Sequence, residues 1–227
     1  MNRPILTHRG RTSWWSRLYL RWTIKLFEPR LFAGLKEIVL FGADMSCELQ
    51  DDQMRPDASS CVLSVPGYYF FGSTGKLPWI GIYLDEVSRG IPFPLSFTPL
   101  MVFRFGRVLA HEAMHHRLHL KPDKQYVPVH EEALADAFAD RFERVLSRHW
   151  LFGFWRWLLH DLSRWHFVAG SVDFRAGDLH RAQQKFYTAW LLDRRNTDAA
   201  TLFWQLCESR SSDTVRANGH SKSDSTR

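Results

Sequence analysis

The chain has 227 residues, which is enough for one compact domain and a smaller appendage. Its 45% hydrophobic and 15% aromatic content excludes a largely disordered protein. Thirty lysines and arginines against 24 acidic residues give a net charge of +6, and no apolar stretch predicts a transmembrane helix. The 3 cysteines are odd in number and lack a disulfide spacing, which favours a reducing, cytoplasmic location.

Positive charge is concentrated in residues 1–42, which hold eight lysines or arginines and two glutamates. Within this N-terminal segment, tryptophans and leucines accompany Arg17, Arg21 and Lys25, which recur every four residues as on one side of a helix. A basic amphipathic helix with tryptophan is typical of an anchor at an anionic membrane surface. A helix that packs on the rest of the protein and shows only its arginines to water fits the pattern equally well. The basic residues match no nucleic-acid-binding motif, so no nucleic-acid partner is expected.

Residues 43–148 are predicted to form an α+β domain with a small sheet. The polar run from Asp44 to Asp57 is expected to be a loop. Two runs rich in β-forming residues, at 60–72 and 78–87, are expected to contribute two or three strands. The helices of this domain are expected to follow the strands.

The first of these helices, at about residues 98–119, carries a metal-binding pattern. Thr98 is predicted to be its N-cap and Pro99 its first helical residue. The run His-Glu-Ala-Met-His at 111–115 places two histidines four positions apart, so both imidazoles lie on one face and can hold one ion. Glu112 between them would lie beside that ion, where it can act as a general base toward water.

A second predicted helix, from about residue 130 to residue 147, offers the third ligand. Glu132 in its first turn is preferred because Asp136 follows at i+4 on the same face. A zinc-bound histidine usually donates its other N–H group to a carboxylate, and Asp136 is placed for that role. The weaker alternatives for the third ligand are His119, His130 and Glu131.

Residues 149–208 are predicted to be helical, and residues 209–227 to be a disordered tail. Within 163–196, small and aromatic residues fall where a tetratricopeptide repeat places its packing positions. These residues are Gly170, Gly177, Ala182, Phe186, Ala189 and Asn196. The segment therefore resembles one tetratricopeptide-like helical hairpin, with a capping helix at 197–208. Such repeats bind peptide segments, so the resemblance implies a protein partner at the hairpin.

The two motifs of residues 43–148 together resemble a known family. His-Glu-Ala-Met-His followed by Glu-Ala-Leu-Ala-Asp at 132–136 is similar to the gluzincin metallopeptidases, especially the heat-shock and prenyl-protein type. The resemblance implies a zincin-like catalytic domain, with an active-site helix and a glutamate helix beside a small sheet. The Zn²⁺ ligands implied by it are His111, His115 and Glu132. It also implies that Glu112 is the general base and that Asp136 orients a ligand.

The function that follows from the resemblance is hydrolysis of peptide bonds in a peptide or protein substrate. Tyr126 and His130 are the nearest candidates for a donor to the developing oxyanion, and both can equally be ordinary loop residues. The strand expected at 79–87 either lines the cleft and pairs with extended substrate, or is a plain core strand. The alternative function is a zinc-binding or degenerate zincin that serves as a scaffold through its C-terminal helices. The presence of the base Glu112 favours the enzyme.

Overall fold

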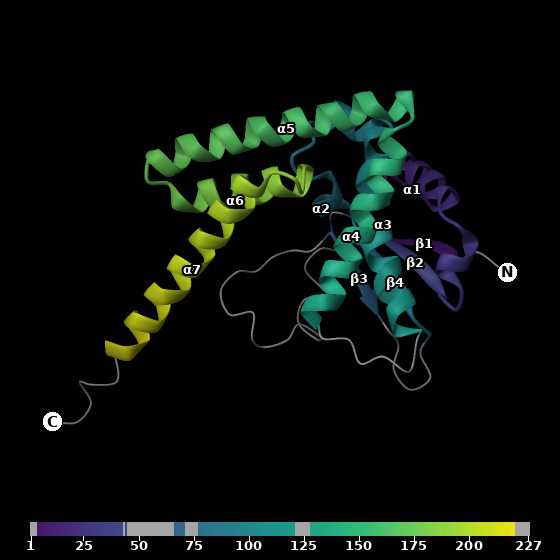
Figure 1. Cartoon of the computed structure of the whole chain (residues 1–227), viewed down its shortest axis with the longest axis horizontal. Coiled ribbons are helices and arrows are strands. Elements are labelled where there is room, and N and C mark those ends of the chain that lie inside the picture. The colour runs from purple at the N-terminus through teal and green to yellow at the C-terminus, as the bar shows by residue number, and fades with distance from the viewer. Residues whose placement is uncertain (1–3, 43, 45–65, 71–76, 121–127, 221–227) are drawn as a thin grey trace. The chain divides into compact units, whose positions relative to one another are not determined.

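The computed structural model describes residues 4–42, 44, 66–70, 77–120 and 128–220. The fold is α+β, with one four-stranded sheet in the N-terminal two thirds of the chain and a run of long helices after it (Figure 1). The predicted fold class is therefore confirmed at the level of α+β.

The sheet is mixed and has the strand order β1-β2-β4-β3. Strands β1 (Ile5–Arg9), β2 (Glu37–Phe41) and β4 (Trp79–Tyr83) run parallel. Strand β3 (Gly67–Phe70) pairs antiparallel with β4 at the edge of the sheet. β2 and β4 are short apolar runs of the kind that a strand buried on both faces requires, because helices and loops cover both sides.

The helices of the first part of the chain connect and cover these strands. They are α1 (Trp14–Leu26), the 3-10 helix η1 (Pro29–Phe32), α2 (Leu84–Ser88), the 3-10 helix η2 (Phe93–Phe97), α3 (Leu100–His119) and α4 (Pro128–Ser147). α3 contacts β3, β4, α1 and α4, so it is the central helix of this part of the chain. Most residues of α3 are buried, including Leu100, Met101 and Phe105, which are fully inaccessible to solvent. The metal-binding pattern therefore lies on a helix that packing holds in place.

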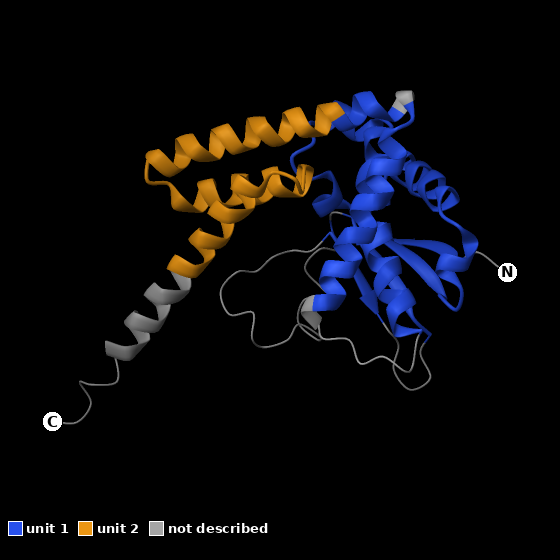
Figure 2. Ribbon diagram, viewed as in Figure 1, with its two compact units in different colours: residues 1–51, 64–156 blue, residues 52–63, 157–227 orange. Residues whose placement is uncertain are grey.

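The chain divides into two compact units (Figure 2). Unit 1 comprises residues 1–51 and 64–156, and unit 2 comprises residues 52–63 and 157–227. The expected boundary at residue 42 is absent, because β1 and β2 pair with each other and β2 pairs with β4. The N-terminal segment is thus part of the domain that carries the motif.

Two local predictions in unit 1 are corrected. The strand expected at 78–87 ends at Tyr83, and Leu84–Ser88 form helix α2. Thr98 does not cap α3: its hydroxyl donates to the Leu95 carbonyl, and Pro99 takes the N-cap position. The expected loop at 44–57 lies almost wholly outside the described residues.

Unit 2 contains a helical hairpin followed by a third helix. α5 (Trp150–Arg175) begins in unit 1 and continues through unit 2, α6 (Leu179–Leu192) returns after a tight turn, and α7 (Thr197–His220) follows. Gly177 in the turn has φ +81°, a conformation that side chains with a Cβ rarely adopt. Asp178 caps α6 by accepting a hydrogen bond from the backbone N–H of Arg181.

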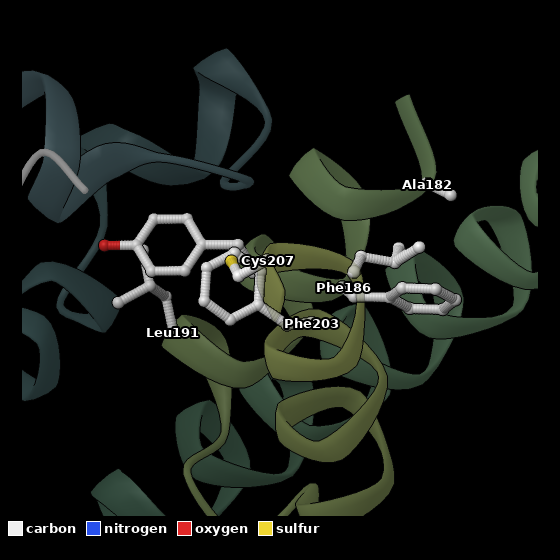
Figure 3. Packing of buried hydrophobic residues seen from close by; sticks show 7 residues of the cluster. Ala182, Phe186, Leu191, Phe203 and Cys207 are labelled. Atoms are coloured by element: carbon white, nitrogen blue, oxygen red, sulfur yellow. The ribbon is translucent and has the colours of Figure 1, made fainter. Parts of the chain in front are cut away.

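The core of unit 2 is apolar and lies mainly between α6 and α7 (Figure 3). Its buried members are Ala182, Phe186, Tyr187, Leu191, Phe203, Leu206 and Cys207. Gly170 of α5 lies against Phe186: a Cβ at Gly170 would sit 2.9 Å from the Cδ1 atom of that ring. The close approach expected at Gly170 is thus present. The likeness to a tetratricopeptide repeat stays a prediction.

Two further expectations for the C-terminal part change. α7 continues to His220, where a disordered tail was expected from residue 209. Cys207 takes part in a disulfide bond, although the sequence offers no disulfide spacing. Within the described residues, no helix combines the length and the apolar character that crossing a bilayer requires.

Candidate metal centre

The two histidines of the motif point at the same place from α3. They are four positions apart, and the distance between His111 Nε2 and His115 Nε2 is 3.1 Å. His115 is 9% exposed, and His111 is partly buried. Because both Nε2 atoms face one point, they can act as neighbouring ligands of a single ion.

Glu132 supplies the third converging group from the first turn of α4. One carboxylate oxygen lies 3.3 Å from His111 Nε2, and the other lies 3.5 Å from His115 Nε2. The two Glu132 distances involve different oxygens of the carboxylate, and one ligand atom from each of the three residues lies within 4.8 Å of the other two, near enough for the three side chains to share one ion. No other three side chains of suitable type converge in this way in the described part of the chain.

The second nitrogen of each ring faces a carboxylate. His111 Nδ1 lies 3.2 Å from Asp136 Oδ1, as the sequence predicts. His115 Nδ1 lies 2.9 Å from Glu131 Oε1, which the sequence analysis weighed only as an alternative ligand. A proton on each Nδ1 would donate to its carboxylate and leave the Nε2 lone pair directed at the common point. The two adjacent glutamates therefore have different roles in the cluster. Glu132 belongs to the donor set, and Glu131 orients His115.

The carboxylates also set the charge state of the donors. Burial lowers the pKa of His111, but hydrogen bonds to Asp136 and Glu132 outweigh it and raise the value to about 10. The hydrogen bond from His111 lowers the pKa of Glu132. Without a metal the cluster therefore holds a proton at neutral pH. A divalent cation would displace this proton and take over its role in balancing the carboxylates.

Glu112 lies beside the donor set, between α3 and β3. It is 8% exposed, and burial raises the pKa of its carboxyl group, while both motif histidines lower it. The backbone N–H of Tyr69 donates to the Glu112 carboxylate. The approach is close because β3 has a glycine there: a Cβ at Gly67 would lie 2.9 Å from Glu112 Oε1. The base expected from the motif is therefore held against an edge strand.

Arg107 joins α3 to α4 one turn before the first histidine. Its guanidinium lies 2.5 Å from Asp140, 3.1 Å from Glu143 and 3.8 Å from Asp136. Asp136 therefore contacts both Arg107 and His111. These ion pairs set the position of α4 along the axis of α3. That position determines where Glu132 lies relative to the two histidines.

A glycine on α3 allows α4 to come close. A Cβ at Gly106 would lie 2.4 Å from Cε1 of Phe142, so the ring rests directly on the α3 backbone. The other side of Phe142 stacks on Phe27 at 4.3 Å between ring centroids. The α3–α4 distance is thus set by an aromatic ring held between a glycine and a second ring.

Of the other candidate residues, His119 contacts the edge of the cluster, with 2.9 Å between its Nε2 atom and Glu131 Oε1. Tyr126 lies outside the described residues, and His130 is exposed on the first turn of α4. His116 is fully buried and faces Tyr69 and the Ala33 carbonyl, so it anchors α3 to neighbouring backbone.

Tyr68 of β3 lies near Glu112 in the chain fold, and its side chain is on the face of β3 opposite to that of Gly67 and Tyr69, which face α3. Burial raises the pKa of its hydroxyl, and the nearby Glu112 carboxylate raises it further. The phenol therefore keeps its proton at neutral pH. Only the pairing of β3 with the sheet brings it near Glu112, and no spacing in the sequence carries that information.

Comparison with known proteins gives no independent identification. No protein-family profile, no curated protein and no solved structure matches this chain.

Proposed function

We propose that this protein is a zinc-dependent peptidase of the gluzincin type. The observation that carries the proposal is the convergence of His111, His115 and Glu132, whose ligand atoms lie within 4.8 Å of one another, with a carboxylate behind each imidazole. A buried pair of oriented histidines with an acidic third donor is the ligand type of catalytic zinc. The catalytic set would also include Glu112.

The ion, when bound, would act as a Lewis acid toward a substrate carbonyl and lower the pKa of water to near neutrality. Glu112 would accept the proton of the attacking water and transfer it to the leaving amine. Burial suits it to both steps, because a raised pKa brings the carboxyl group closer to the working pH.

An extended peptide is the substrate that the surroundings favour. β4 was the strand expected to pair with substrate, but it lies between β2 and β3 and has no free edge. β3 is the edge strand of the described sheet, and it passes beside Glu112. A peptide added antiparallel or parallel to β3 would form backbone hydrogen bonds along it and bring its carbonyl groups past the base.

The test is a comparison of the parent protein with Glu112→Gln. Both are loaded with Zn²⁺, assayed on casein and on a peptide library, and analysed for bound metal. We expect one zinc per chain in both proteins and turnover reduced about 10²–10⁴-fold in the variant, because the substitution removes only the proton acceptor.

His115→Ala serves as the companion variant, with its fold checked by circular dichroism. It should lose both zinc and turnover. If the parent and Glu112→Gln hold one zinc but are equally inert, the scaffold alternative replaces the peptidase. If the parent takes up no zinc at micromolar concentration, the peptidase and the zinc-binding scaffold are both rejected, and only a degenerate scaffold remains.

A further inference from the structure

Helix α1 exposes an apolar strip that its packing in unit 1 leaves uncovered. Trp14, Trp15, Trp22 and Leu26 are 59%, 43%, 47% and 47% exposed. At 100° per residue these positions fall within one third of the helix circumference. Three tryptophans on one strip are far more apolar surface than a solvated helix needs, so the strip has the character of a binding surface.

The opposite side of α1 packs against the rest of unit 1. Leu20 and Thr23 are fully buried, and Ile24 is nearly so. The hydroxyl of Tyr19 donates to the Phe97 carbonyl at 2.7 Å, which ties α1 to the segment before α3. The sequence analysis weighed a packed helix against a membrane anchor. The helix packs, and it still shows its tryptophans to solvent.

The exposed tryptophans are held in place by the packed face. Trp15 stacks on Tyr19 at 6.1 Å between ring centroids, and Trp22 meets the same ring edge-on at 5.7 Å. Trp14 contacts Trp15 edge-on at 4.8 Å. A rigid strip loses little conformational entropy when it is covered, which favours binding.

The positive charge around the apolar strip indicates which kind of partner it binds. The exposed Arg21 lies between the apolar strip and the buried face, the exposed Lys25 lies within the strip next to Trp14, and α1 contains no acidic residue. The basic surface continues past the N-terminus of α1 into a shallow cavity, whose lining includes His8, Arg11 and Arg17. Tryptophan with adjacent cations matches the interface of an anionic bilayer, where indole rings enter the headgroup region and cations meet lipid phosphates.

We propose that the Trp14–Leu26 face of α1 docks unit 1 on the surface of an anionic lipid bilayer. The helix would lie in the plane of the membrane, with its buried side still packed in unit 1. The proposal does not depend on the peptidase activity, because none of the α1 residues named contacts the candidate metal centre.

The α5 helix of the same chain provides a contrast. Trp157 and Trp165 are 57% and 62% exposed on one side of α5, as much as the α1 tryptophans. Asp161 lies between them in sequence and on the same side, and it is exposed. An acidic group in the middle of the strip opposes contact with anionic lipid. The α5 tryptophans are therefore a matched control.

The experiment is flotation of the full-length protein with vesicles. Phosphatidylcholine vesicles with and without phosphatidylserine are compared at low and high salt. We expect binding to the anionic vesicles that weakens with salt, and little binding to the neutral ones.

Two pairs of variants test the surface. Trp14→Gln with Trp22→Gln should lower partitioning at least about tenfold, while Trp157→Gln with Trp165→Gln leaves it unchanged. Arg21→Glu with Lys25→Glu should lower it at least about 25-fold, from about fivefold per cation. Arg141→Glu with Arg144→Glu on α4 makes the same change in net charge away from α1 and should have a much smaller effect.

Several outcomes overturn the proposal. Absence of parent binding to anionic vesicles does so whatever the variants show. Equal losses from the α1 and control variants would mean nonspecific attraction. If the parent is a dimer in sedimentation and the α1 tryptophan variant a monomer that leaves vesicle binding unaltered, the strip is an interface between two copies of the chain.

Discussion

The α3–α4 contact of unit 1 and the α5–α6 contact of unit 2 share one packing feature. They differ in the side chains that surround it. In each, a glycine of one helix receives an aromatic ring of the next: Gly106 meets Phe142, and Gly170 meets Phe186. Beside the first contact lie the cation of Arg107, its carboxylate partners and the converging histidines. Beside the second lie the apolar core of α6 and α7 and the ion pair of Lys185 with Asp173.

The difference supports placing the proposed site at the α3–α4 contact. An apolar interface gains stability from burial, whereas buried charges are costly unless each is paired. The α3–α4 interface holds many ionisable groups at positions where leucines would pack with a smaller desolvation penalty. Such an arrangement is typical of a site whose chemistry needs those groups, and clustered pKa shifts accompany it.

The largest predicted effect comes from adding one methyl group at each glycine. Gly106→Ala places a Cβ 2.4 Å from the Phe142 ring, and Gly170→Ala places one 2.9 Å from the Phe186 ring. Each should destabilise the protein by about 1–3 kcal/mol in urea unfolding, because neither packed ring can yield freely. Only Gly106→Ala should also weaken zinc binding, since it moves α4 and Glu132 away from the histidines. Equal zinc affinity in the two variants would contradict the role assigned to the α3–α4 spacing.

A smaller effect is predicted for the carboxylate that the sequence did not single out. Glu131→Gln replaces the acceptor behind His115 with an amide of the same size. Loss of such a partner typically weakens metal binding about 10–100-fold, and we expect that loss in competition titration with a zinc chelator. Asp136→Asn should behave similarly through His111. An unchanged zinc affinity in Glu131→Gln would show that His115 is oriented by packing alone.

The sequence predicts which histidines and which carboxylates share a helix face, because helical periodicity is a local property. The i, i+4 spacing puts His111 and His115 on one face, and the same spacing links Glu132 to Asp136. It could not assign Glu131, since a single helix leaves open which histidine nitrogen its neighbour faces. That assignment depends on the position of α4 along the axis of α3. Arg107 and Phe142 set this position through their contacts across the interface.

The sheet was harder to predict for a similar reason. β1 and β2 are five residues each, and their partners lie far along the chain. β1 is mostly polar and solvent-accessible, so neither length nor hydrophobicity distinguishes it from a loop. The run at 79–87 has β-forming residues throughout, yet its second half becomes α2, where Glu86 is buried and pairs with Arg89. Tertiary contacts override local propensity there.

The smallest predicted effect is that of Asp140→Asn, and it separates charge pairing from metal orientation. Asp140 and Asp136 are both about half exposed, and both contact Arg107, but only Asp136 reaches a histidine. Solvent screens the Asp140–Arg107 pair, and Glu143 remains as a partner for the arginine, so stability should fall by less than about 1 kcal/mol. Zinc affinity should stay at the parental value, in contrast to Asp136→Asn. If both substitutions weaken zinc equally, the acidic face of α4 acts through its overall charge, and the individual hydrogen bond from His111 to Asp136 has no separate role.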